Sequence, residues 1–224
     1  MSMLDAYEPV ASRTLPVVLL LDTSGSMRED DKIEVLNDSV TEMIEELTEV
    51  DAGHDFITLS IITFGGAAAS LVTNNVPMAH IEYASLKANG RTPMGDALRI
   101  ARELIEDREA FPSRSFLPTL ALVSDGIPTD PSWEPELERL LEGERGRKAT
   151  RFALAIGVDA DRDLLARFAN GQVHEASEAA EIRNFLRFVT TTVTQTTLSV
   201  FEPDVRAEAD SEESILRLQG DDAF

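Results

Sequence analysis

Hydrophobic and polar residues follow two alternating patterns along the chain. Apolar runs typical of buried strands occupy residues 15–21, 56–64, 117–124 and 152–158. Between them, apolar residues recur every three or four positions, which predicts helices over residues 32–49, 93–107, 135–147, 161–170 and 177 to about 197. Two weaker segments are predicted as a short edge strand and a last strand, at residues 70–73 and 172–175.

Apolar strands that alternate with helices predict the α/β class. We expect a Rossmann-like, doubly wound, mostly parallel sheet with one short antiparallel edge strand and helices on both faces. Residues 14–200 are predicted to form the domain, preceded by an N-terminal extension (1–13) and followed by an acidic C-terminal tail (201–224). In open sheets of this kind, ligands bind beyond the carboxyl ends of the strands. The loops after these strands are therefore the first place to look for function.

Composition narrows the classes of function. The 224 residues are 43% hydrophobic and 27% charged, with a net charge of −21, and none is cysteine. The acidic surface disfavours nucleic acid and anionic membranes and suits divalent cations or basic partners, although solubility alone also explains it. Without cysteine there are no disulfides, thiol nucleophiles or thiolate metal sites, which fits a cytoplasmic protein. No apolar run reaches membrane-span length, and the first residues do not resemble a signal peptide.

Oxygen-bearing side chains follow three of the predicted strands and loops. Asp22, Ser24 and Ser26 come directly after the first strand, in DTSGS. Thr92 lies before a predicted helix in NGRTP, and Asp125 follows another strand in SDG. All five can meet at one edge of a parallel sheet, where they would offer hard oxygen ligands. This set suits Mg²⁺, with Mn²⁺ or Ca²⁺ as alternatives, better than zinc.

Each of these motifs also fits a purely structural role. Asp, Ser and Gly are common turn residues after a strand, and Asp125 begins an Asp-Gly turn. Thr92 before Pro93 is typical of a helix N-cap. Their joint occurrence at strand ends favours the functional interpretation.

The same motifs resemble those of the von Willebrand factor type A (VWA) domain. DTSGSM is similar to its D-x-S-x-S motif, and GRTP and SDG match its later threonine and aspartate, over roughly residues 14–197. In that family these residues form the metal-ion-dependent adhesion site (MIDAS). The resemblance implies that Ser24, Ser26 and Thr92 bind the metal directly, with Asp22 and Asp125 acting mainly through water. It also implies that a partner's Asp or Glu completes the coordination.

Residues beside these motifs are candidates for a partner-contact rim. They are Met27, Arg28, Gly65, Arg91 and Trp133. Arg91 fits a solvated loop equally well, and Trp133 fits helix packing. The three histidines are scattered in loop-like contexts, so we expect none of them to act in catalysis.

The expected function is a non-enzymatic, metal-dependent protein-binding module. A narrower resemblance, to the bacterial tellurium-resistance TerY subgroup, rests on LPVVLLLDTSGSM, LSIITFG and LVSDGIPTD and implies a role in a stress-resistance complex. The alternative is a Mg²⁺-dependent phosphotransfer or phospho-acceptor protein with Asp22 as the reactive group. Haloacid-dehalogenase-type phosphatases need a second Asp two residues later, where this chain has Ser24. Nucleotide-binding glycine motifs are also missing from the sequence.

Two segments have open roles. The threonine-rich residues 190–197 fit an exposed helix end better than a phosphorylated segment. Carboxylates of the acidic tail, such as Glu212 or Asp222, are candidates to occupy a neighbouring molecule's metal site.

Overall fold

The computed structural model describes residues 13–201. A six-stranded sheet runs through this part of the chain in the order β3-β2-β1-β4-β5-β6. Every neighbouring pair is parallel except β2 and β3, which are antiparallel. The predicted α/β class with one antiparallel edge strand is therefore confirmed. The predicted extension and tail, including Glu212 and Asp222, lie outside the described residues apart from their innermost positions.

The strands and helices alternate after the first hairpin. The strands are β1 (Leu15–Asp22), β2 (Ile57–Gly65), β3 (Ala68–Pro77), β4 (Thr119–Ser124), β5 (Thr150–Ile156) and β6 (His174–Ala176). The α-helices are α1 (Lys32–Asp51), α2 (Met94–Glu106), α3 (Trp133–Glu142), α4 (Arg162–Phe168) and α5 (Ala180–Phe201). Short 3-10 helices are η1 (Gly25–Asp31), η2 (Met78–His80) and η3 (Gly146–Lys148).

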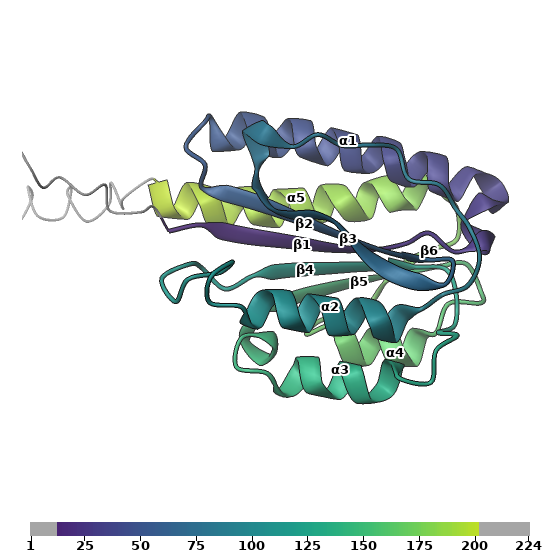
Figure 1. The fold of residues 1–224 in the computed structure, drawn as a ribbon. Coiled ribbons are helices and arrows are strands. Elements are labelled where there is room, and N and C mark those ends of the chain that lie inside the picture. Colours follow the sequence, from purple (N-terminus) through teal and green to yellow (C-terminus); the bar gives the residue numbers. More distant parts are fainter. Residues whose placement is uncertain (1–12, 202–224) are drawn as a thin grey trace, which may run out of the picture.

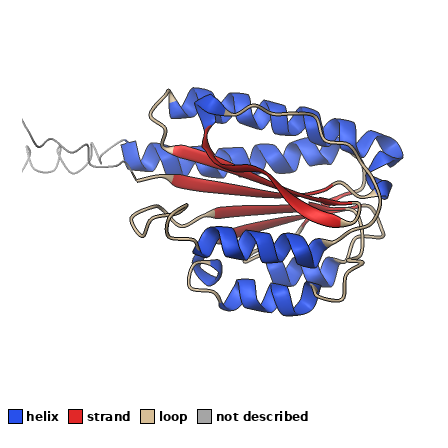
Figure 2. Ribbon diagram, viewed as in Figure 1, coloured by secondary structure: helices blue, strands red, loops and turns tan. Residues whose placement is uncertain are grey.

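Two helical layers enclose the sheet. Helices α1 and α5 cover one face, and α2, α3 and α4 cover the other (Figure 1). Figure 2 shows the strands as a middle layer between them. Side chains alternate across β1: Leu19 belongs to the core beneath α1 and α5, whereas Leu20 belongs to the core beneath α2. Burial on both faces explains why β1 is apolar from its start until Asp22.

The topology places β1 at the point where the chain changes direction across the sheet. After β1, the chain crosses to β2 and β3 on one side, and α2 then brings it back to β4 on the other side of β1. Such switch points leave a crevice at the carboxyl ends of the two central strands. Asp22 ends β1 and Ser124 ends β4, so both lie at the carboxyl ends of these two strands.

Several boundaries differ from the sequence expectations, most of all those of β3 and α3. The edge strand β3 spans ten residues instead of the four expected at 70–73. Exposed and half-buried side chains alternate before and after that segment as well as within it. Helix α3 ends at Glu142, not residue 147, because the chain turns at Gly143 and passes close to Leu140 at Gly146.

No helix within residues 13–201 has the length and apolar character needed to cross a membrane.

Candidate metal centre

The carboxylate of Asp22 is fully buried at the end of β1. Its Oδ1 accepts a hydrogen bond from the Ser24 backbone N–H (2.8 Å), and its Oδ2 accepts one from the Ser124 hydroxyl (2.6 Å). Burial nevertheless raises the pKa of Asp22 to about 6, because the two hydrogen bonds offset only part of the desolvation of the charge. The fold therefore holds a carboxylate whose charged form is disfavoured by its burial.

Ser24, Ser26 and Asp125 form a continuous hydrogen-bonded chain beside Asp22. The hydroxyl oxygens of Ser24 and Ser26 lie 3.0 Å apart, and the Ser26 hydroxyl donates to Asp125 Oδ1 over 2.7 Å. Ser24 and Asp125 are almost fully buried, and Ser26 is half-buried. The first and third predicted motifs, 99 residues apart, are thus in direct contact.

Thr92 reaches the same edge through a loop that packs against the first motif. Its hydroxyl oxygen lies 3.5 Å from the point where a Cβ on Gly126, next to Asp125, would stand. The Gly25 N–H donates to the Gly90 carbonyl over 3.0 Å, which ties the loop before Thr92 to the DTSGS segment. Thr92 itself is buried, and its backbone N–H donates to the Thr129 hydroxyl. All five predicted residues therefore gather around the carboxyl ends of β1 and β4.

Close backbone packing holds this edge together. Gly90 has a φ of +67°, and a Cβ there would stand 2.5 Å from Gly66 Cα. A Cβ on Gly65 would stand 2.2 Å from the Thr23 carbonyl oxygen. Only glycine fits these positions, so the three loops can approach one another closely enough to bring the polar side chains together.

The donor set suits a hard divalent cation. Within residues 13–201, no group of three or more histidine, aspartate or glutamate side chains is placed to hold a metal, so hydroxyl oxygens would have to supply part of the coordination. Ser24, Ser26 and Thr92 offer such hydroxyls, and Asp22 and Asp125 offer negative charge. An incompletely compensated carboxylate at Asp22 is what a cation at this position would correct. The residues present therefore fit a Mg²⁺-type ion.

Sequence patterns did not reveal two further members of the cluster. Lys32, the first residue of α1, places its Nζ 2.9 Å from Asp125 Oδ2, and its side chain is 14% exposed. Ser124 supplies the second hydrogen bond to Asp22. Lys32 lies 93 residues from its partner, and no local motif signals such a pair. Ser124 belongs to the SDG motif, but its place in the sequence predicts only that it ends a strand.

The structure changes the predicted rim. Met27 is fully buried in the core beneath α1, because the turn of η1 directs it inward, so its assignment to a contact rim is wrong. Gly65 is half-buried against the Thr23 backbone. Trp133 is partly buried against the core, with the Arg167 guanidinium 5.6 Å from its ring centroid. Packing is therefore the role that the structure gives to Gly65 and Trp133.

Exposed residues at this edge are of two kinds. Arg28, in η1, and Arg91, in the loop before α2, are exposed cations beside the cluster. Ile127 and Val158 are exposed apolar residues, at 63% and 86%, in the loops after β4 and β5. The Asp161 N–H donates to the Gly126 carbonyl over 3.4 Å, which joins those two loops. The sequence predicted Val158 as the end of a buried strand (152–158), but β5 ends at Ile156 and leaves Val158 exposed. Ile127 was missed because an isolated apolar residue in a loop carries no periodic pattern.

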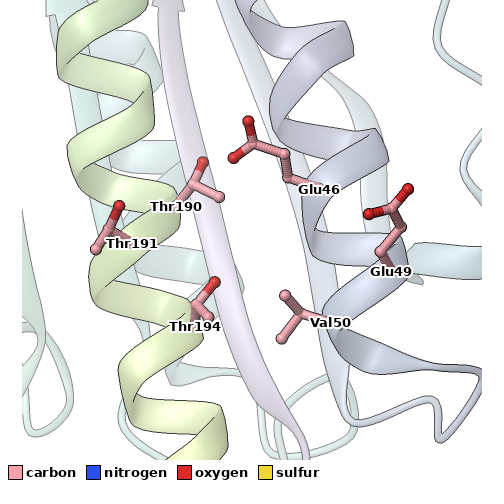
Figure 3. Close-up of a pocket in the computed structure, with 6 residues that line it drawn as sticks. All are labelled: Glu46, Glu49, Val50, Thr190, Thr191 and Thr194. Carbon is pink, nitrogen blue, oxygen red and sulfur yellow. The ribbon is translucent and has the colours of Figure 1, made fainter.

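A separate groove lies between α1 and α5. It has a volume of about 460 Å³ and is lined by Glu46, Glu49, Val50, Thr190, Thr191 and Thr194 (Figure 3). The carboxylates come from the second half of α1, toward the end of the sheet opposite Asp22. The Thr190 and Thr191 hydroxyls donate to the carbonyls four residues earlier in α5. The groove includes none of the predicted site residues.

Comparison with known proteins places the chain in a family. The family model of the von Willebrand factor type A domain matches residues 17–194, well over half of the chain. The chain therefore belongs to the VWA family. A search of curated proteins finds no match.

Solved structures support the same fold. Proximal thread matrix protein 1 from the mussel byssus, solved with a zinc-occupied MIDAS motif, matches with a TM-score of 0.61 and 18% identity over 80% of this chain and 48% of that one. A von Willebrand factor type A structure from Catenulispora acidiphila matches with a TM-score of 0.63 and 19% identity, over 82% and 43% of the two chains. The domain of the pilus tip protein Mfa5 from Porphyromonas gingivalis has a TM-score of 0.65 and 9% identity, over 83% and 97%.

The three structures share 19% or less of their sequence with this chain. At such identities the comparison shows the fold alone. The chain spans about half the length of the mussel structures that it matches. What the neighbouring proteins bind is therefore evidence about those proteins.

Proposed function

We propose that this protein is a non-enzymatic binding module that coordinates a partner's carboxylate through a divalent cation. Ser24, Ser26 and Thr92 would hold the ion directly, and Asp22 and Asp125 would act mainly through water. An Asp or Glu of a protein partner would complete the coordination. The bound ion would supply a Lewis-acidic attachment point on a chain whose net charge of −21 otherwise repels carboxylates.

One observation carries the proposal: a fully buried carboxylate lies beside a cluster of hydroxyls at the switch point of the sheet. The pKa of Asp22 is raised to about 6 by burial, so ionised Asp22 is poorly compensated by its surroundings. The hydroxyls of Ser24 and Ser26 meet next to it. Membership in the VWA family, whose members commonly bind partners through a metal at this position, gives the cluster a coherent role.

The same geometry weighs against phosphotransfer through Asp22. A nucleophile or phospho-acceptor must be reached by its substrate. Asp22 has no exposed surface, and both of its carboxylate oxygens accept hydrogen bonds. The binding module is therefore the function that we favour.

Finer parts of the proposal rest on the sequence. Mg²⁺ is the proposed ion, with Mn²⁺ or Ca²⁺ as alternatives, because every donor is a hard oxygen. A cytoplasmic location is proposed from the cysteine-free composition. A place in a tellurium-resistance or other stress-response complex rests on the TerY resemblance alone.

Titration calorimetry of the metal-stripped protein tests the proposal. Mg²⁺, Mn²⁺ and Ca²⁺ are titrated into the wild type, the double variant Asp22→Ala/Ser24→Ala, and Asp38→Ala, which removes an exposed carboxylate from α1. We expect one saturable site in the wild type and in Asp38→Ala, and none in the double variant. Equal binding by all three proteins would contradict the proposed centre.

A further inference from the structure

Lys32 contributes a cation to the cluster in an unfavourable local setting. It is the first residue of α1, where the helix dipole disfavours positive charge. The N-cap residue Asp31 makes no side-chain capping hydrogen bond. Asp30 and Asp31 have φ values of 54° and 56°, left-handed conformations that are costly for residues other than glycine. Three local rules of helix initiation are therefore broken where Lys32 enters α1.

The contact that Lys32 makes offers a reason for these departures. Its Nζ donates to Asp125 Oδ2, while Asp125 Oδ1 accepts from Ser26. The Asp125 side chain has no exposed surface, so its charge is shielded little by solvent. Lys32 thus fixes the orientation of Asp125 and adds a positive charge within the cluster. Local costs that coincide with a functional cluster are expected when the geometry serves function.

We propose that Lys32 is a positioning residue that sets the charge of the metal centre in favour of the partner's carboxylate. Asp22, Asp125 and Lys32 together carry one net negative charge. A divalent cation would make the cluster net positive by one, and a single incoming carboxylate would neutralise it. Without Lys32, the metal-loaded cluster would already be neutral. Lys32 therefore weakens metal binding and strengthens carboxylate binding, and this inference rests on the proposed function.

Charge-removing and charge-conserving variants separate this role from simple packing. Lys32→Met keeps most of the apolar stem and removes the charge, whereas Lys32→Arg keeps the charge. Lys148→Met removes the same charge from an exposed residue of η3 and serves as the matched control. Circular dichroism establishes that each variant is folded before metal is added.

Two titrations measure the two effects. Mn²⁺ and Mg²⁺ calorimetry of the stripped proteins gives the metal affinity, and acetate titration of the Mn²⁺-loaded proteins, followed by water-proton relaxation, gives the carboxylate affinity. We expect Lys32→Met to bind metal at least about tenfold more tightly, which corresponds to about 1.4 kcal/mol, and to bind acetate more weakly. Lys32→Arg and Lys148→Met should behave like the wild type. A merely structural role would not move the two affinities in opposite directions.

The outcomes distinguish this inference from the proposed function. If the wild type binds metal and Lys32→Met binds it equally or more weakly, the role of Lys32 is overturned and the metal centre stands. If Lys32→Met binds acetate as tightly as the wild type does, the role is also overturned. If neither the wild type nor Lys32→Met binds metal, both fail.

Discussion

Replacing Asp22 with asparagine should stabilise the metal-free protein at neutral pH. Asp22 is fully buried, and burial raises its pKa from 3.8 to about 6. One pKa unit corresponds to about 1.4 kcal/mol, so the ionised carboxylate costs the folded state about 3 kcal/mol at pH 7.5. Asparagine removes this cost, but its single side-chain oxygen can accept only one of the two hydrogen bonds that Ser24 and Ser124 donate to Asp22, and its NH₂ group has to donate to the Ser124 hydroxyl instead. We expect a net gain of about 2 kcal/mol in the free energy of unfolding.

The stability difference between Asp22→Asn and the wild type depends on pH. Because the folded-state pKa of Asp22 lies above the unfolded one, the folded wild type takes up a proton more readily than the unfolded chain does. The contribution of Asp22 to the free energy of unfolding of the wild type therefore falls as the pH rises from about 4 to about 6. The advantage of Asp22→Asn should be greatest above pH 6 and should disappear near pH 4.

Urea unfolding in EDTA at pH 7.5, 6.0 and 4.5 measures this difference. Asp38→Asn is the control, since it makes the same substitution at an exposed position of α1. Mg²⁺ at about 100 times its dissociation constant should then stabilise the wild type by about 2.7 kcal/mol and leave Asp22→Asn nearly unchanged. The reasoning is refuted if Asp22→Asn is no more stable than the wild type in EDTA at pH 7.5, or if its advantage is the same at pH 4.5.

Three further substitutions test close backbone packing and buried hydrogen bonds elsewhere in the fold, each by urea unfolding. Gly90→Ala should destabilise the protein by more than about 2 kcal/mol, because the φ is +67° and the new Cβ would stand 2.5 Å from Gly66 Cα. Arg151→Met should cost about 3 kcal/mol, because the buried guanidinium donates to three backbone carbonyls. Tyr83→Phe should cost about 1 kcal/mol through the lost 2.7 Å hydrogen bond to Asn37 Oδ1.

Matched substitutions accompany the first two of these. Gly171→Ala places a Cβ in open space, and Arg147→Met removes an exposed guanidinium. Both should change stability by no more than about 0.5 kcal/mol. If either matched variant is as unstable as its test variant, the assigned contact does not explain the loss.

The strands and long helices of this fold were predictable because each is buried in a way that leaves a regular pattern of apolar residues in the sequence. A strand covered on both faces is apolar at nearly every position, as in β1, and a helix covered on one side shows the helical period, as in α1. The segment η1 escaped prediction because Met27 is its only apolar residue, so no period exists to detect. Its buried side chain also explains why exposure of Met27 was wrongly expected.

The meeting of Asp22 and Asp125 was predictable from topology, because the carboxyl ends of neighbouring parallel strands share one edge. The loop connections were not, since they depend on close packing such as that of Gly90 on Gly66. The Lys32–Asp125 pair was also beyond sequence reasoning. It requires two consecutive left-handed aspartates to direct the start of α1, and that conformation cannot be inferred from residue type alone.

A crystal structure of the Mn²⁺-loaded protein, with anomalous diffraction data, tests the proposed centre most directly. We predict one strong manganese peak in contact with the hydroxyl oxygens of Ser24, Ser26 and Thr92, with Asp22 and Asp125 linked to it through water. Asp22→Ala/Ser24→Ala crystals prepared in the same way should lack the peak. A wild-type structure without manganese at this edge, with the Ser24–Ser26 hydrogen bond intact, would contradict the metal-dependent role.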